Sequence, residues 1–356
     1  MVRTTPLREI ALLRLVAQRL TGPPEPDAAA AVRWMTAMQA QDFRGALVSV
    51  ALRTDGGSSS KVEAALSAGE VVRSWPLRGT LHFVAAEDLR WLLDLTAHRQ
   101  AANAARRRAQ LELDDAAISR ADELAQRALS GGGRLARKDL FAEWSRGGVS
   151  VAGQRGYHLL WHLAQGGRLC LGPVQDGEQL VVLVDEWVPA SRRLDRDEAL
   201  GHLAVRYFRS HGPASVADLA RWAGLPLGDV RAGVAIARPH LDRLEVDGVE
   251  YLLDPRTPEL LDAYRHQARG VFLLPGFDEL LLGYGDRSAS LPAEFAAQIV
   301  PGGNGMFRPT VVADGQVVGT WRTVGRGSAR TVEATPFTTF SAKVAAAIPR
   351  RHAALP

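Results

Sequence analysis

Gln39 and Gln41 are the residues whose types and spacing best fit a chemical role in this chain. Each amide carries two donor hydrogens and an acceptor oxygen. Together, two such side chains can orient a water molecule and turn carbonyl oxygens toward a developing positive charge. Amides are poor acids and bases, so the pair suits a leaving group that departs without protonation. The alternative is a pair of solvated glutamines at a helix end, with no chemical role.

The two glutamines follow the apolar run 32–38, which predicts a helix over about 27–40. This helix is the second of three predicted near the N-terminus, the others covering about 7–20 and 61–68. A hairpin of 71–75 with 80–84 follows them. Three helices and a hairpin make the winged helix-turn-helix plan, so the glutamines are expected at a helix end in the first of several such units.

The clearest copy of this plan spans 195–254. After a helix over 195–211, Ser215 opens a second helix with a capping-box pattern in which Asp218 replaces the usual glutamate. Pro226 suits the first turn of a third helix, and an Asp-Gly hairpin centred on Asp247 completes the unit. Another copy, at about 116–184, ends in a similar hairpin.

The last part of the chain breaks the repeat and predicts a small β-rich module. Strands are expected at 270–274 and 279–282, an Asp-Gly hairpin at 310–322 and a further strand at 331–333. A helix near 341–351 closes the module. The predicted fold class is therefore α+β, mainly α. The expected domains are 1–110 (first winged-helix unit and a linking helix), 111–190 (second unit), 191–265 (third unit) and 266–356 (C-terminal β-rich module with a terminal helix).

Several segments, taken together and in order, resemble one family. They are MQAQD at 38–42, SWPLRGTLHFV at 74–84, EDLRW at 87–91, LPGFDELLLGY at 274–284 and GMFRPTVV at 305–312. This set is similar to the AlkZ/YcaQ winged-helix DNA glycosylases, and the similarity runs over nearly the whole chain. The Gln-apolar-Gln form is the AlkZ-like one, since the YcaQ-like branch has Asp at the second polar position.

The resemblance implies that Gln39 and Gln41 are the catalytic residues. Five more residues in or near the family-like segments are candidates for binding DNA or supporting the site: Arg78, His82, Asp278, Trp321 and Arg322. Structural roles are the alternatives. Arg78 and His82, expected on one face of a wing strand, could fix the wing to the body. Asp278 could cap a turn, and Trp321 could belong to the core.

The resemblance also implies a function: hydrolysis of the N-glycosidic bond of N7-alkylguanine in double-stranded DNA, including bulky adducts and interstrand crosslinks. An N7-alkylated guanine is already cationic and leaves without protonation, which matches an amide pair. Asp42 beside the pair either adds a carboxylate or makes a local structural contact. A winged-helix transcription regulator without catalytic activity is the main alternative. A protein that sequesters a DNA-reactive small molecule is a third.

Composition narrows the remaining classes of function. Of the 43 basic residues only three, Lys61, Lys138 and Lys343, are lysines, and arginine is the better ligand for phosphate. The net charge is +4. Cys170 is the only cysteine, which excludes an internal disulfide and a Cys-pair zinc site. No metal, no cofactor and no membrane span are expected. The predicted protein is a cytoplasmic monomer.

Overall fold

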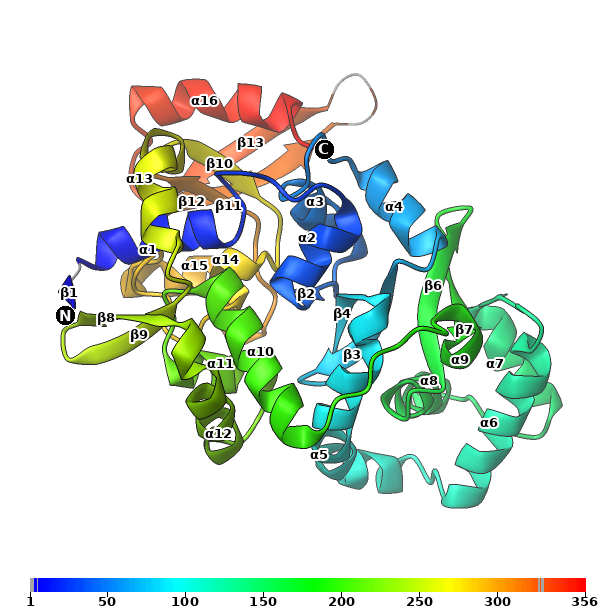
Figure 1. Cartoon of the computed structure of the whole chain (residues 1–356). Helices are drawn as coiled ribbons and strands as arrows, with labels where there is room; N and C mark the ends of the chain where they lie inside the picture. The colour runs from blue at the N-terminus through cyan, green and yellow to red at the C-terminus, as the bar shows by residue number, and fades with distance from the viewer. Residues whose placement is uncertain (1–2, 5, 326, 328–329) are drawn as a thin grey trace. The chain divides into compact units, whose positions relative to one another are not determined.

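The computed structural model describes residues 3–4, 6–325, 327 and 330–356. It is a mixed α+β structure with more helix than strand (Figure 1). By its internal contacts the chain divides into two compact units. The first combines residues 1–61 with 200–356, and the second comprises residues 62–199. Both boundaries fall inside helices, α4 (Ser59–Ser67) and α10 (Arg196–His211).

A four-stranded antiparallel sheet organises the C-terminal part of the first unit. Its order is β10-β11-β12-β13, with these bounds: β10 Val271–Leu274, β11 Thr310–Ala313, β12 Gln316–Val324 and β13 Thr331–Pro336. Alternate residues face opposite sides of a strand. Accordingly, Leu273 packs with Ile348 of α16 (Ala342–Ala353), whereas Leu274 joins the cluster on the other face. Figure 1 shows α16 lying along this sheet.

Two helices that are far apart in the sequence pack together in the cluster that contains Leu274. α1 (Leu7–Ala17) contributes Ile10 and Leu13, and α13 (Thr257–Ala268) contributes Leu261. Helix α1 therefore packs with the C-terminal part of the chain. Between β10 and β11 lie α14 (Glu279–Leu282), α15 (Ala296–Ile299) and the 3-10 turns η3 (Ala293–Phe295) and η4 (Pro301–Gly303). The strand predicted at 279–282 is wrong, because Asp278 caps a helical turn there through the Leu280 N–H.

The 195–254 segment folds in the predicted order. Its elements are α10, α11 (Val216–Ala223), α12 (Leu227–Ala237), the 3-10 turn η2 (Arg238–His240), β8 (Asp242–Val246) and β9 (Val249–Leu253). The capping box of Ser215 and Asp218 is present. Pro226 stands at the N-cap of α12. Strand β8 also pairs in parallel with β1 (Arg3–Thr4).

The helix predicted over 27–40 is too long. The structure has α2 (Ala28–Met35), then Thr36 with a φ of 69°, then the short strand β2 (Met38–Gln39). A further helix, α3 (Phe43–Ala51), was not expected at all. The chain leaves the helical conformation at Thr36 because a positive φ ends the run of α-helical dihedrals. Gln39 and Gln41 consequently lie on the connection between two helices.

The second unit contains hairpins and helices in turn. After β3 (Val71–Leu77), β4 (Thr80–Ala85) and the 3-10 turn η1 (Ala86–Asp88) come the following elements: α5 Leu89–Gln110, α6 Asp115–Leu129, β5 Leu135–Ala136, α7 Arg137–Arg146, α8 Arg155–Gln165, β6 Leu169–Gln175, β7 Glu178–Leu183 and α9 Val184–Trp187. Within the unit the strand order is β4-β3-β6-β7-β5. One apolar core, which includes Trp144 and Leu160, lies beneath α6, α7 and α8.

The sequence predicted Arg78 on a wing strand, and this prediction is wrong. Arg78 occupies the turn between β3 and β4, with a φ of 52°, and Gly79 follows with a φ of 67°. Two successive positive φ values are typical of a type I′ hairpin turn.

In the described part of the chain, no helix is long and apolar enough to cross a membrane.

Candidate active site

The connection that carries the two glutamines belongs to the first unit. Gln39 is half-buried in β2, Ala40 is fully buried, and Gln41 is exposed. Burial of the alanine fixes the main chain between the two amides. The residues before α3 therefore hold one glutamine partly in the protein and present the other to solvent.

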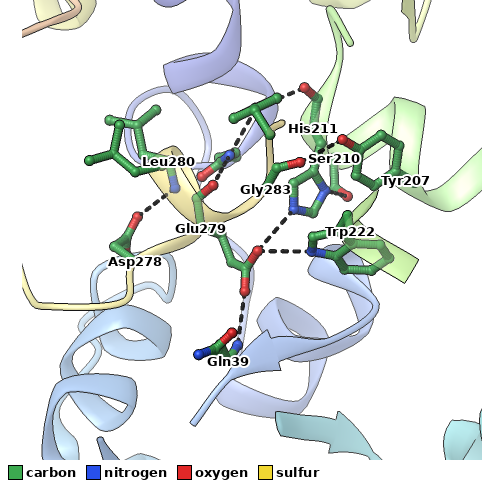
Figure 2. A network of polar contacts seen from close by, with 12 residues as sticks. Gln39, Tyr207, Ser210, His211, Trp222, Asp278, Glu279, Leu280 and Gly283 are labelled. Carbon is green, nitrogen blue, oxygen red and sulfur yellow. Dashed lines mark hydrogen bonds and ion pairs between the residues drawn. The ribbon is translucent and has the colours of Figure 1, made fainter. Parts of the chain in front are cut away.

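Glu279 anchors this connection. Its Oε1 accepts a hydrogen bond of 2.8 Å from the main-chain N–H of Gln39, 240 residues earlier in the chain (Figure 2). Its Oε2 accepts one of 3.0 Å from Trp222 Nε1. Glu279 is 1% exposed. Both carboxylate oxygens thus have a donor, as a buried charged group requires.

His211 lies beside the same carboxylate. Its Nε2 is 3.5 Å from Glu279 Oε2, and its Nδ1 is 2.8 Å from the Ser210 hydroxyl. The imidazole is stacked on Tyr207, with ring centroids 4.7 Å apart. Burial lowers the pKa of His211 below its ordinary value, and the hydrogen bond and charge of Glu279 oppose that shift only in part. The histidine is therefore neutral near pH 7.

Asp278, a predicted support residue, is buried and makes a different set of contacts. Its oxygens accept two hydrogen bonds of 2.9 Å from Nη1 and Nη2 of Arg53, a side chain with no exposed surface. The Ser49 hydroxyl donates to Asp278 Oδ2. Arg53 also donates to Gln18 Oε1. These contacts join α3, which follows the glutamines, to the start of α14.

A pocket of about 950 Å³ lies beside the exposed end of this connection, within the first unit. Its walls include Asp42, Arg44, Trp321, Arg322, Thr323 and His352. The Asp42 carboxylate lies against the first turn of α3, where a Cβ on Gly45 would be only 2.6 Å from Oδ2. Any larger residue at position 45 would displace the carboxylate.

Trp321 and Arg322 thus line the same pocket as Asp42, the residue that follows Gln41. Trp321 is half-buried, and its Nε1 donates to the Leu274 carbonyl at 2.9 Å. Arg322 is 70% exposed and pairs with Glu333 at 2.8 Å. An exposed ion pair of this kind contributes at most about 1 kcal/mol. The guanidinium can exchange its carboxylate for another anion at little cost.

Arg78 and His82 belong to the second unit. His82 is fully buried, and its Nδ1 is 2.8 Å from the Thr80 carbonyl, so this nitrogen carries the proton. Nε2 then accepts a hydrogen bond of 3.3 Å from Arg78. His82 orients the Arg78 side chain. The structure thus brings Arg78 and His82 into contact.

Sequence reasoning did not identify Glu279, His211 or Trp222. Glu279 stands in the family-like segment 274–284, but a predicted strand gave no reason to bury its carboxylate. His211 is one of several histidines that share no spacing in the sequence. The available signal was an acidic pair, Asp278 and Glu279, among apolar residues. Across the described ranges, no group of three or more His, Cys, Asp and Glu side chains could hold a metal ion.

Comparison with known proteins gives three similarities. The family model for DNA glycosylases described as AlkZ-like matches residues 32–355. A protein of Streptomyces sahachiroi named interstrand DNA cross-link repair glycosylase is 26% identical over 340 residues, covering 89% of this chain and 88% of the relative. The solved structure of Streptomyces sahachiroi DNA glycosylase AlkZ has a TM-score of 0.80 and 24% identity, over 99% of this chain and 98% of that one.

Proposed function

Because the chain belongs to the AlkZ-like DNA glycosylase family, we propose that it hydrolyses the N-glycosidic bond of N7-alkylguanine in double-stranded DNA. Gln39 and Gln41 would carry the reaction. The observation that carries this proposal is their placement: one amide is half-buried on an anchored main chain, and the other is exposed beside a pocket lined by Arg44 and Arg322.

The chemistry of amides determines the substrate class. Cleavage of an N-glycosidic bond develops positive charge on the sugar, as in glycoside hydrolysis. The carbonyl oxygens of Gln39 and Gln41 face that charge and orient the attacking water. Neither amide can protonate a leaving base. The substrate base must therefore be cationic before cleavage begins, which is the case for guanine alkylated at N7.

Exposure of Gln41 supports extension to large lesions. Most glycosylases rotate the target nucleotide into a tight pocket, which a bulky adduct or a crosslinked base cannot enter. A reactive amide at the surface removes that requirement. We propose that the substrates include bulky adducts and interstrand crosslinks, in keeping with the name of the Streptomyces sahachiroi relative.

The DNA would be held by arginines. Arg322 and Arg44 line the pocket beside Asp42, and Trp321 forms part of the same wall. Arg78, oriented by His82, would supply a further cation. Asp278 would act indirectly, by fixing α3 through Arg53. Arginine binds phosphate through two parallel hydrogen bonds, so these contacts would position the duplex without reading its sequence.

We further propose that three segments have winged-helix architecture. They are the predicted units at 7–84, 116–184 and 195–254, and the last two contain, in chain order, α6-β5-α7-α8-β6-β7 and α10-α11-α12-β8-β9. Pairing of β5 with β7 supplies the third strand of a wing sheet in the second segment. In the third, an isolated bridge from Ala214 to Leu252 of β9 has the same role. The protein would act as a monomer in the cytoplasm without a cofactor.

Excision kinetics on alkylated duplex DNA test the catalytic assignment. Gln39→Ala and Gln41→Ala should each slow single-turnover release of N7-methylguanine by roughly 10²–10³-fold, the typical cost of losing one preorganised transition-state contact. DNA affinity should change by no more than about threefold, because the amides act mainly in the transition state. Melting curves verify folding.

Gln41→Asp is the matched variant. It keeps an oxygen acceptor and adds a negative charge beside the developing cation, so part of the activity should survive. If both alanine variants fold and excise at the wild-type rate, the pair is structural and its catalytic assignment fails. A sequence-specific shift of an undamaged duplex without base release would indicate a transcription regulator.

A further inference from the structure

The main-chain N–H of Gln39 is held by a buried carboxylate, which is an unusual partner for a strand residue. Strand N–H groups are ordinarily satisfied by carbonyl oxygens of a neighbouring strand. Here Glu279 Oε1 lies 2.8 Å from the Gln39 nitrogen, and the glutamate is 1% exposed. A buried carboxylate loses its hydration, so it is a far more costly hydrogen-bond acceptor than a neutral carbonyl oxygen.

The carboxylate is itself held from the opposite side. Oε2 accepts the indole N–H of Trp222 at 3.0 Å, and Nε2 of His211 lies 3.5 Å away (Figure 2). Trp222 is 1% exposed and His211 is fully buried. The three side chains come from α14, α11 and α10. Glu279 therefore cannot rotate away from Gln39 without breaking a second buried hydrogen bond.

We propose that Glu279 is a positioning residue for the glutamine pair. Its carboxylate clamps the main chain at Gln39, and the buried Ala40 transmits this orientation to Gln41. Glu279 contacts the peptide group and takes no part in bond cleavage. The proposal rests on the proposed function, since it assigns the clamp to the same two amides.

The network suggests a rescue experiment. In Glu279→Gln, one carboxamide oxygen must serve two donors, the Gln39 N–H and the Trp222 indole, and its NH₂ group faces one of them. Adding Trp222→Phe removes one donor. The introduced carboxamide oxygen then accepts from Gln39, and the NH₂ group of the same carboxamide donates to His211 Nε2. In this variant the imidazole proton can move to Nδ1, because the Ser210 hydroxyl, 2.8 Å from Nδ1, can accept it while donating to the Arg206 carbonyl.

Single-turnover excision should follow that pattern. A displacement of about 1 Å in a reacting geometry costs about 10²-fold in rate, so Glu279→Gln should lose roughly 10–100-fold in rate with DNA affinity within about twofold of wild type. The Glu279→Gln/Trp222→Phe double variant should recover part of the rate. Trp222→Phe alone should fall between wild type and Glu279→Gln, because Glu279 Oε1 keeps the Gln39 N–H while Oε2 loses its indole donor. Tyr207→Phe is the matched control. It removes a buried hydroxyl that donates to the Gly283 carbonyl at 2.6 Å, in the same cluster but away from Gln39.

A second measurement is independent of activity. Hydrogen exchange at the Gln39 amide, followed in the peptide covering 36–43, should accelerate in Glu279→Gln and return toward wild type in the double variant. Tyr207→Phe should leave it unchanged. If Glu279→Gln does not fold, Glu279→Asp replaces it: the shorter side chain keeps the charge but moves the carboxylate away from the Gln39 nitrogen.

The outcomes separate this inference from the proposed function. If Gln39→Ala is slow while Glu279→Gln excises at the wild-type rate with unchanged amide protection, the clamp is wrong and the function stands. If Gln39→Ala and Gln41→Ala both excise at the wild-type rate, the catalytic assignment of the pair fails whatever Glu279 does. A double variant no faster than Glu279→Gln would mean that removing the indole donor does not restore the contact with the Gln39 N–H, which overturns the clamp.

Discussion

Arg53 and Asp278 form a buried, two-pronged ion pair: Nη1 and Nη2 of the guanidinium each lie 2.9 Å from a different carboxylate oxygen. The two side chains are 0% and 4% exposed. Arg53 directly follows Leu52, the C-cap of α3, and Asp278 is the N-cap of α14. The pair thus joins the helix after the glutamines to the residue before Glu279.

Breaking this pair should destabilise the protein strongly. Removing one partner leaves an uncompensated buried charge, which costs about 3–5 kcal/mol. Asp278→Asn and Arg53→Met should each lower the free energy of unfolding by that amount, measured in urea. The double variant should cost less than the sum of the two, because the charges are lost together. Strict additivity would show that the two side chains do not depend on each other.

DNA binding should fall steeply with salt and depend weakly on sequence, because arginine–phosphate contacts release counterions. Arg322→Ala should reduce the slope of log K against log salt by about 1. Arg256→Ala is the control, since this exposed arginine pairs with Asp254 and does not line the pocket. A slope that Arg322→Ala leaves unchanged would remove Arg322 from the DNA-binding surface.

The product should be an abasic site without strand scission. Glycosylases that nick the strand attack the sugar with an amine and form a Schiff base. The three lysines are exposed, and none lines the pocket near Asp42; Lys61 donates to the Gly56 carbonyl on the surface. Gels run before and after alkali should show cleavage only after alkali. A protein–DNA adduct trapped by borohydride contradicts this prediction.

Stability should decline below about pH 6.5. Burial lowers the pKa of His211, and also those of His158 and His162, below the ordinary value of 6.5. As the pH falls through 6.5 the unfolded chain binds protons that the folded protein does not, so the free energy of unfolding decreases. Each histidine can contribute up to about 1.4 kcal/mol per pH unit.

Urea unfolding of the wild type and His211→Gln at pH 7.5 and 5.5 measures how much of the acid-induced loss of stability comes from His211. The variant should lose less stability between the two pH values than the wild type does. Part of the acid sensitivity should persist through His158 and His162. Equal losses in both proteins would show that His211 is not the group that resists protonation.

Local patterns predicted much of the fold. Hairpins with Asp-Gly turns at 176–177, 247–248 and 314–315 are all present, since a two-residue turn with positive φ values is a local requirement. The capping box at Ser215 is equally local. The course of the chain around Gln39 was missed because Thr36 adopts a positive φ that its residue type does not favour.

The sequence predicted only part of the candidate site. A motif identified Gln39 and Gln41, but the groups around them meet through long-range packing. Trp222 and Glu279 are 57 residues apart, and Arg53 and Asp278 are 225 apart. No spacing rule connects such positions. The same lack of a local signal placed 279–282 in a strand, although the Asp278 side chain starts a helical turn there.

The separation between Gln39 and its anchor also sets the order of events during synthesis. A ribosome adds about 5–20 residues per second, so the strand that bears Gln39 waits on the order of tens of seconds for Glu279 to emerge, 240 residues later. The first 61 residues likewise complete their unit only with residues 200–356. A nascent or prematurely terminated chain that ends before residue 279 has no clamp for its glutamines. The clamp forms only after residue 279 has left the ribosome.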